Sequence, residues 1–572
     1  MLVDLLSARG EELQASNETP WNIYPRPQMR RDSFLNLNGQ WNFTAFSDGS
    51  SQPPISYDQN IQVPFCPESA LSGIGNHFPE GMGLYYHRSF TLPENFNRGR
   101  VLLHIGAADQ ITDIQVNGDH ERFDVHEGGY EAFSFDITDV LREENVLEIR
   151  CTDDLTNKYY PYGKQTLSRG GMWYTPVSGI WQTVWLESVP ETYIRKLNIE
   201  NRGNSVTISI EPKLDGKVII PALGEFALEN GSITITPENP HLWSPEDPYL
   251  YDFIVEAGED RVESYFAIRS LEIKKVGHYP RLCLNGKPYF FHGLLDQGYW
   301  PDGIFTPAKP ECFADDILAM KRLGFNTLRK HIKVEPEEFY YQCDKLGMIV
   351  FQDMVNNGDY NFLRDTALPT IGLQKLDDRN LHRDATTRQM FLEGMAATVN
   401  QLKNHPCIVY WTIFNEGWGQ FDSDAVYEHF RQLDDTRFID TTSGWFRRKK
   451  TDVDSRHVYF RKVKLRGDGV KPLVLSEFGG KTYRSEGHVF NPDKTYGYGG
   501  CDSLEKLNEA VAKLYLDEVL PCVKNGLCAA IYTQVSDVED EINGLLTYDR
   551  KVCKLDEATM IPIAAALQNA MK

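Results

Sequence analysis

The sequence predicts three domains in series: an N-terminal β jelly roll, an immunoglobulin-like β-sandwich and a C-terminal (β/α)8 TIM barrel. A chain of 572 residues is too long for a single hydrophobic core. Up to about residue 273, short alternating apolar runs are separated by Gly, Asn, Asp and Pro, which is typical of antiparallel strands. From residue 274, strand-like runs alternate with amphipathic segments long enough for helices. We therefore expect domains at residues 1–188, 189–273 and 274–572.

Two all-β regions come first. Residues 39–44, 85–92 and 179–186 alternate apolar and polar side chains, as strands of a sandwich or jelly roll do. Residues 205–210 and 232–236 are the clearest strands of the second region. The length of that region fits a small immunoglobulin-like sandwich.

Eight candidate strands follow, enough for a TIM barrel. They are residues 290–293, 327–329, 348–351, 408–414, 438–441, 457–460, 473–475 and 527–532. Residues 313–320 and 504–519 carry apolar side chains at helical spacing. In such a barrel the carboxyl ends of the strands form the active face.

Two glutamates stand where buried strands end. Glu416 follows strand four, in Ile413–Gly419, and Glu477 follows strand seven, in Leu473–Gly480. Taken alone, each glutamate would be interpreted as an ordinary acidic residue at the end of a strand. A charge that is buried and unpaired at such a place costs a large amount of free energy, so we expect both side chains to face a polar site. Two such carboxyls suit cleavage of a glycosidic bond, where one delivers a proton and the other faces the anomeric carbon as an anion.

The charge and the cysteines exclude several classes of function. The chain has 59 Lys and Arg against 81 Asp and Glu, a formal net charge of -22, which opposes binding to nucleic acid or to an anionic membrane. The sequence has no apolar run of spanning length and no secretory pattern at residues 1–9. The ten cysteines are scattered and show no metal or redox motif. We expect a cytoplasmic protein with reduced thiols and no metal or cofactor; homo-oligomerisation stays open.

Segments along nearly the whole chain resemble glycoside hydrolase family 2, which includes β-galactosidases and β-glucuronidases. The resemblance rests on residues 37–43, 126–130, 133–138, 174–182, 284–288, 323–326, 415–416 and 476–479. It implies a sugar-binding-like jelly roll, an immunoglobulin-like linker and a catalytic barrel. A small carbohydrate or glycoside is the partner that it implies.

The same resemblance implies a retaining exo-β-glycosidase that hydrolyses terminal β-D-hexosides by double displacement. Carried over by position, Glu416 is the general acid/base and Glu477 the nucleophile. Asn415 binds the hydroxyl next to the anomeric carbon, and Tyr459 donates a hydrogen bond to the nucleophile. Retention predicts carboxyl groups about 5 to 5.5 Å apart, whereas inversion needs about 6.5 Å or more.

Basic residues after strand two bear on the choice of sugar. Arg329, Lys330, His331 and Lys333 lie toward the expected catalytic rim. They either pair with the acids of this protein or bind a carboxylated sugar, since a guanidinium holds a carboxylate with two hydrogen bonds. Arg329 and Lys330 point opposite ways from a strand, so at most one of them enters the pocket. A β-hexuronide is the leading substrate class.

One departure from the family narrows this expectation. Members specific for glucuronides carry an Asn-x-Lys pair just before a Thr-Arg-Asp-Arg-like stretch. Here that stretch is Thr547–Arg550 and the preceding residues are Glu541–Gly544, so the carboxylate-binding lysine is missing. This favours a β-galacturonide over a β-glucuronide, or a neutral β-galactoside.

Other residues at strand ends are candidate sugar ligands. Trp418 and Trp445 are placed to stack on a pyranose. Tyr532 stands where many relatives have Trp, which predicts a narrower stacking surface, and Gln534 lies just beyond it. Asp353 either binds a sugar hydroxyl or supports a residue that does. Two other functions use the same architecture: a noncatalytic carbohydrate-binding protein, and a transglycosylase that transfers the sugar to another sugar.

Overall fold

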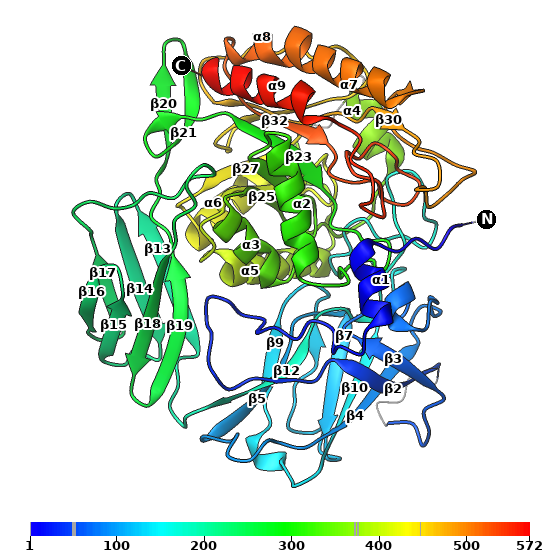
Figure 1. Cartoon of the computed structure of the whole chain (residues 1–572), viewed down its shortest axis with the longest axis vertical. Helices are drawn as coiled ribbons and strands as arrows, with labels where there is room; N and C mark the ends of the chain where they lie inside the picture. Colours follow the sequence, from blue (N-terminus) through cyan, green and yellow to red (C-terminus); the bar gives the residue numbers. More distant parts are fainter. Residues whose placement is uncertain (1, 48–52, 371–372, 374–376, 447, 572) are drawn as a thin grey trace.

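Antiparallel sheets occupy the first half of the chain and a parallel barrel the second (Figure 1). The computed structural model describes residues 2–47, 53–370, 373, 377–446 and 448–571. In Figure 1 the barrel lies between the blue N-terminal sheets and the helices of the C-terminal end, with the second set of β-sheets to one side.

Two antiparallel sheets enclose the N-terminal core, which includes Trp41, Phe43 and Ile149. Strand β10 (Asn145–Thr152) alternates buried and half-buried side chains along its length, as a strand with one face toward a core does. One sheet has the order β1 (Leu35–Asn36), β12 (Val184–Val189), β5 (Arg100–Ile105), β9 (Phe133–Asp136). The other has the order β3 (Gln59–Val63), β2 (Gly39–Phe46), β4 (Gly83–Phe90), β10, β7 (Ile111–Val116), β8 (His126–Glu127). The short pair β6 (Ala108–Asp109) and β11 (Gly179–Ile180) lies beside them.

The second β region packs a three-stranded sheet and a four-stranded sheet around its own core, which includes Ile208 and Val255. The first sheet is β13 (Lys196–Arg202), β14 (Ser205–Glu211) and β17 (Ser232–Ile235). The second is β16 (Gly224–Leu228), β15 (Gly216–Ile220), β18 (Tyr251–Ala257) and β19 (Asp260–Phe266). A hairpin sheet, β20 (Leu271–Val276), β21 (Tyr279–Leu284) and β22 (Lys287–Pro288), then leads into the barrel. The domain boundaries 1–188, 189–273 and 274–572 themselves stay a prediction.

Eight parallel strands form the barrel, so the predicted fold class is confirmed. Every residue of β26 is buried, as expected for a strand covered on both faces. The spatial order is β27 (Phe438–Ser443), β26 (Ile408–Asn415), β25 (Ile349–Asp353), β24 (Thr327–Lys330), β23 (Phe291–Asp296), β32 (Leu527–Thr533), β29 (Leu473–Gly479), β28 (Asp454–Val458). The first and last strands of this order, β27 and β28, are not paired in the described structure, although Ser443 Oγ and Ser455 Oγ approach to 3.4 Å.

The sequence located the strands but not all of their ends. The sixth strand was expected at 457–460 and is found at Asp454–Val458, so Tyr459 and Phe460 lie beyond it. The first strand was expected at 290–293 and extends to Asp296. The helix expected at 504–519 divides into α7 (Leu504–Lys513) and a π-helical turn (Leu514–Val519), followed by α8 (Leu520–Val523).

The remaining helices cover the outside of the barrel or connect its parts. They are α1 (Ala8–Ala15), α2 (Glu311–Arg322), α3 (Glu337–Leu346), α4 (Leu368–Thr370), α5 (Ala385–Leu402), α6 (Ser423–Leu433) and α9 (Glu557–Asn569). Short 3₁₀ turns occur at Ala70–Ser72 and Thr138–Val140, and a π-helical turn at Leu363–Ala367. Among the described residues, none of the helices combines the length and the apolar composition that a membrane crossing requires.

A segment of the N-terminal domain reaches the rim of the barrel. We call residues 159–175 the bridging segment. Its Tyr162 backbone N–H donates to the carbonyl of Asn356, after β25, at 3.0 Å. Its Thr175 backbone N–H donates to Glu539, after β32, at 2.8 Å. The N-terminal domain therefore takes part in forming the active face of the barrel.

A second contact between domains centres on the buried carboxylate of Asp344, near the end of α3. Asp344 accepts hydrogen bonds from Tyr265 Oη of β19 at 2.7 Å and from the Cys407 backbone N–H at 2.7 Å. His405 Nδ1 also lies 2.7 Å from it. One side chain thus connects the second β region to the start of β26.

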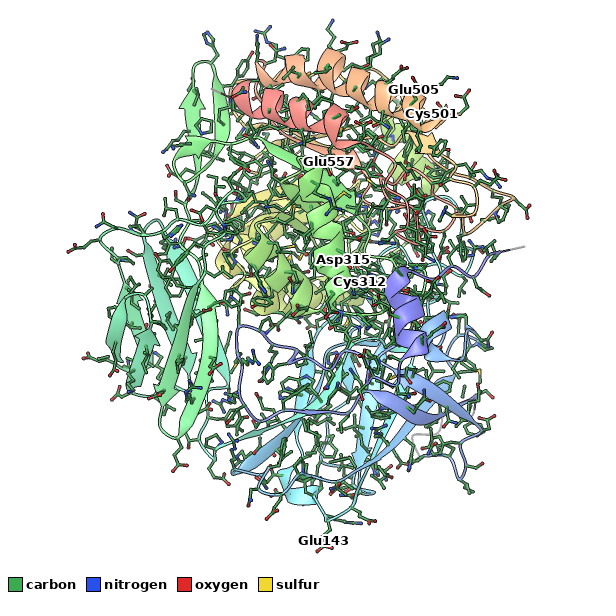
Figure 2. All side chains as sticks on the ribbon, in the orientation of Figure 1. Glu143, Cys312, Asp315, Cys501, Glu505 and Glu557 are labelled. Atoms are coloured by element: carbon green, nitrogen blue, oxygen red, sulfur yellow. The ribbon has the colours of Figure 1, made fainter. Side chains whose placement is uncertain are left out.

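Replacement of Asp344 by Ala should lower the thermal unfolding midpoint by several degrees. The substitution leaves buried polar groups without their acceptor, at a cost of about 2–5 kcal/mol. The matched control is Asp315→Ala on α2, labelled in Figure 2, because the Asp315 side chain is 54% exposed and pairs with Arg9 at the surface. Equal midpoints for the Asp344 variant and the wild type would show that this contact does not stabilise the fold.

Candidate active site

Glu416 and Glu477 meet at the carboxyl ends of the barrel strands. Glu416 directly follows the last residue of β26, and Glu477 is the fifth residue of β29. Both are buried, at 7% and 4% exposure. One carboxylate oxygen of each glutamate and a ring nitrogen of His457 lie within 4.8 Å of one another.

A tight turn at the end of β26 presents Glu416 to this site. Its φ of 50° is in the left-handed region, which costs a residue with a side chain about 1–3 kcal/mol. Gly417 follows with a φ of 79°, and a Cβ on it would overlap the ring of Phe446. The turn therefore requires glycine at 417, and the strain is concentrated at the residue with the proposed chemistry.

The surroundings of Glu477 favour its ionised form. Tyr459 Oη donates to Glu477 Oε2 at 2.5 Å, and Arg329 Nη1 donates to Oε1 at 3.0 Å. His457 Nδ1 lies 3.4 Å from Oε2. Burial opposes ionisation, but the interactions with His457 and Arg329 and the hydrogen bond from Tyr459 outweigh it, and the pKa of Glu477 is lowered.

Arg329 joins four strand ends through one buried guanidinium, which is 1% exposed. From β24, its Nε donates to Asp353 Oδ1 at 3.0 Å, at the end of β25. Its Nη2 donates to Asn415 Oδ1 at 2.9 Å, at the end of β26. Its Nη1 donates to the Ser476 carbonyl of β29 at 3.0 Å, in addition to Glu477. Burial opposes the charge of Arg329, but Asp353 and Glu477 more than compensate and raise its pKa.

Glu416 and Asn415 complete the centre of the site. Glu416 Oε1 lies 2.7 Å from His457 Nδ1, and His457 Nε2 lies 2.9 Å from Ser443 Oγ. Because Arg329 occupies the amide oxygen of Asn415, the amide is oriented, and its buried Nδ2 has no hydrogen-bond partner. That nitrogen is a hydrogen-bond donor whose acceptor is not supplied by the described residues. A sugar hydroxyl could serve as its acceptor.

The two lysines predicted as substrate ligands, Lys330 at the end of β24 and Lys333 just after it, pair with acids. Lys330 Nζ donates to Asp296 at 2.6 Å and to Glu335 at 2.8 Å. Lys333 Nζ donates to Glu335 at 2.9 Å and to the carbonyls of Gly298 at 2.5 Å and Phe305 at 2.7 Å. The structure thus places both lysines in a buried ion-pair cluster around Glu335. Their expected role as substrate ligands has no support from these contacts.

His331 and Asp353 are placed as a pair. His331 Nδ1 lies 2.8 Å from Asp353 Oδ2, and burial lowers the pKa of His331 to about 4. A neutral imidazole therefore stands 6.3 Å from the ring of Trp418. Asp353 supports both Arg329 and His331, the supporting role that was one of its two expected alternatives.

The two predicted tryptophans lie near the carboxylates. The ring of Trp445 is 5.6 Å from that of His457. Trp418 lies 5.4 Å from Trp173 of the bridging segment and 5.7 Å from Tyr360. The indole N–H groups of Trp418 and Trp445 are buried without a partner. They are two further donors at this site that a polar ligand would satisfy.

Tyr532 and Gln534 are placed differently from what the sequence suggested. The ring of Tyr532 packs 5.5 Å from Phe478 and 6.2 Å from Tyr515, which belongs to the helical layer. Its hydroxyl accepts from the Lys481 backbone N–H at 3.0 Å. These contacts hold the ring in the wall of the barrel and give no stacking surface for a sugar. Gln534 Oε1 accepts from Gln297 at 2.7 Å, and its buried Nε2 has no partner.

Sequence reasoning missed four residues at this site: His457, Lys164, Glu541 and Trp173. His457 belongs to the predicted sixth strand, and its place two residues before Tyr459 was the available signal. Lys164 and Trp173 come from the first domain, more than 200 positions before Glu416. Their spacing carries no signal, because only the fold brings the bridging segment to the barrel.

Glu416, His457 and Glu477 are also close enough to hold a metal ion. Both oxygens of Glu477 already accept hydrogen bonds, one from Arg329 and one from Tyr459. A guanidinium 3.0 Å from a carboxylate disfavours a second cation beside it. The arrangement fits acid, base and nucleophile roles better than metal binding.

Comparison with known proteins gives the family. The profile described as "Glycosyl hydrolases family 2, TIM barrel domain" matches residues 275–553, and "Glycosyl hydrolases family 2" matches residues 192–269. A β-galactosidase of Thermoanaerobacter pseudethanolicus is 23% identical over 525 residues, covering 82% of this chain and 65% of that protein. A β-glucuronidase of Felis catus is 25% identical over 463 residues, covering 69% of this chain and 65% of that protein. This chain thus spans just under two thirds of the length of both relatives.

Two solved structures share the fold. The β-D-glucuronidase of Dictyoglomus thermophilum has a TM-score of 0.71 at 20% identity, covering 96% of this chain and 98% of that chain. A β-galacturonidase of Eisenbergiella tayi bound to galacturonate has a TM-score of 0.66 at 18% identity, covering 96% of this chain and 99% of that chain. At these identities the likeness concerns the fold alone.

Replacement of Arg329 by Met should destabilise the protein in a pH-dependent way. At pH 7 the loss leaves Asp353 and Glu477 buried without their cation, at a cost of about 3–5 kcal/mol. In the wild type the pKa values of both carboxyls are lowered, so the stability they supply is present above their unfolded values of about 4 and is lost as pH falls further. In the variant their pKa values rise, and protonation relieves the buried charge.

Thermal unfolding midpoints at pH 7.5 and pH 5 test this. The deficit of the variant relative to wild type should be largest at pH 7.5 and smaller at pH 5. Arg379→Met, at an exposed pair with Asp377, is the control and should show no deficit at either pH. A deficit that is equal at the two pH values would mean that Arg329 acts through packing and not through these carboxylates.

Proposed function

This chain belongs to glycoside hydrolase family 2, and on that premise we propose that it is a retaining exo-β-glycosidase acting on terminal β-D-hexosides. The observation that carries the proposal is the pair Glu416 and Glu477, with carboxylate oxygens within 4.8 Å of each other at one site. That separation suits direct attack on the anomeric carbon, since retaining enzymes hold the two carboxyls about 5–5.5 Å apart and inverting enzymes leave room for a water.

In the first step Glu477 attacks the anomeric carbon. Its lowered pKa keeps it an anion, and Tyr459 and Arg329 fix the direction of its two oxygens. A bond forms between Glu477 and the sugar while the glycosidic bond breaks, and the leaving oxygen takes a proton from Glu416. In the second step Glu416 takes a proton from water, and the water oxygen displaces Glu477 from the anomeric carbon.

Asn415 contributes to both steps. Asn415 Oδ1 and Glu477 Oε1 accept from the same Arg329 guanidinium, and among the described residues Asn415 Nδ2 has no hydrogen-bond partner. A donor in that position suits the hydroxyl next to the anomeric carbon, a contact that strengthens as positive charge develops on the ring. The noncatalytic alternative gives no reason for a nucleophile that is held ionised.

For the substrate we propose a β-hexuronide, with β-galacturonide preferred over β-glucuronide. The relatives include proteins named β-glucuronidase and β-galactosidase, and the fold neighbours include one named β-galacturonidase. Residues Glu541–Gly544, which precede Thr547–Arg550, lack the carboxylate-binding lysine that the resemblance expects in glucuronide-specific members. The axial hydroxyl of a galacturonide requires a different pocket, which this departure permits.

A neutral β-galactoside is the second candidate. The observation in its favour is that Arg329, Lys330 and Lys333 all have carboxylate partners within the protein and are not free for a substrate carboxylate. Glu541 adds a further carboxylate to the site, because it is close enough to Glu477 to interact with it electrostatically. A carboxylate near the sugar suits hydroxyls better than it suits another carboxylate.

The experiment that tests the function is a panel of p-nitrophenyl β-D-glycosides: galacturonide, glucuronide, galactoside and glucoside. The wild type should release nitrophenol from at least one of them, and the galacturonide should have the highest kcat/KM. Glu477→Gln should lower kcat by about 10⁴-fold or more, because the nucleophile is gone.

Glu505→Gln is the control, since Glu505, labelled in Figure 2, is exposed on α7. It should turn over the panel at the wild-type rate. Undiminished turnover in the Glu477 variant would place the chemistry at another site. Turnover of the galactoside alone would select the second candidate.

A further inference from the structure

Lys164 is a buried lysine of the bridging segment that faces the aromatic side chains of the site. It is 6% exposed. Its Nζ lies 5.1 Å from the ring centre of Trp418 and 5.9 Å from that of Tyr174. Within the part of the chain that the structure describes, this Nζ makes no hydrogen bond and no ion pair within 4 Å. Lys330 and Lys333, by contrast, each have a carboxylate within 3 Å.

The backbone around Lys164 is fixed from both sides. The Tyr162 N–H donates to the Asn356 carbonyl at 3.0 Å, and the Tyr174 N–H donates to the Lys164 carbonyl at 3.1 Å. Gly163 has a φ of 64°, and a Cβ there would be 2.9 Å from the carbonyl oxygen of Ile332. The close approach of the segment to the barrel therefore needs glycine beside Lys164. The lysine is held at the site before any ligand arrives.

The electrostatic neighbours of Lys164 are the acids of the active site. Burial lowers its pKa, and Glu541, Glu477 and Glu416 oppose that effect. The oxygens of Glu541 are already used, because Tyr174 Oη donates to one at 2.5 Å and Asn543 Nδ2 donates to the other at 2.9 Å. A buried charge without a matched partner is costly in a folded protein. The cost is removed when an anion binds beside it.

We propose that Lys164 binds the carboxylate of the terminal sugar and so makes the enzyme selective for uronides. This inference rests on the proposed function. It identifies the cation for the substrate carboxylate, which the residues after β32 do not supply. Residues Glu541–Gly544 contain no lysine, and Lys164 supplies the cation from the N-terminal domain instead. As a point charge on a flexible stem, it holds the carboxylate without fixing the hydroxyl pattern of the sugar. The hydroxyls are then read by groups such as Glu541.

The first experiment compares kcat/KM on p-nitrophenyl β-galacturonide and β-galactoside. Lys164→Met should lower kcat/KM for the uronide by 100-fold or more, mainly through KM, and change the value for the galactoside less than fivefold. Lys164→Arg keeps the charge and should recover much of the loss. Lys158→Met is the matched control, because Lys158 lies earlier in the same loop, over the ring of Tyr162, and should not change either value. Equal losses on both substrates, or no loss on the uronide, would overturn the proposal.

The second experiment measures binding without turnover. Wild-type protein should bind free D-galacturonate at least tenfold more tightly than D-galactose in isothermal titration, and Lys164→Gln should remove the difference. Wild type that prefers galactose contradicts the role of Lys164, whether or not any variant folds. If galacturonate binds through Lys164 but no glycoside of the panel is cleaved, the proposed hydrolase function fails and the binding role stands. If only the galactoside is cleaved and Lys164→Gln changes neither binding nor rate, the hydrolase stands and the role of Lys164 fails.

Discussion

The buried guanidinium of Arg329 is the interaction on which this site depends. It donates to Asp353, Asn415 and Glu477, and so it ties the ends of β25, β26 and β29 to its own strand β24. A charge with 1% exposure is tolerated only with such partners, and each partner is held in place in return. Arg329 therefore orients the Asn415 amide and, together with His457 and Tyr459, favours the ionised form of Glu477.

Buried charges in this barrel fall into two groups. Lys330 and Lys333 pair with Glu335, and Lys554 pairs with Asp537 at 2.6 Å, so these charges are satisfied within the protein. Among the residues that the structure describes, Lys164 has no carboxylate partner. Asn415 Nδ2 and the indole N–H groups of Trp418 and Trp445 are buried there without a hydrogen-bond partner. Polar groups that the protein leaves unsatisfied at one place mark where a ligand completes the structure. The bridging segment contributes Lys164 and Trp173 from the N-terminal domain, so two domains supply side chains to the site.

The sequence predicts much of this because the local patterns are strong. Mostly apolar strands such as β26 and alternating ones such as β10 differ in period, and that difference separates the barrel from the sandwiches. Glu416 and Glu477 were proposed as site residues because in each case a charge follows a buried strand. The partners of Arg329 and Lys333 were not predictable, because a strand end does not show which acid the fold will bring to it. The packing of Tyr532 was not predictable for a related reason, since the sequence does not show whether a ring faces the sugar or the helices. Lys164 gave no signal at all.

The central claim is that Glu477 attacks the sugar, and covalent trapping tests it most directly. A 2-deoxy-2-fluoro-β-glycoside of the preferred sugar, with a good leaving group, slows both steps and lets a glycosyl-enzyme accumulate. Peptide mass spectrometry should then find one fluorosugar on the peptide that contains Glu477, and none in the Glu477→Gln variant. An adduct on another residue, or turnover that releases the inverted anomer without any adduct, would contradict the account.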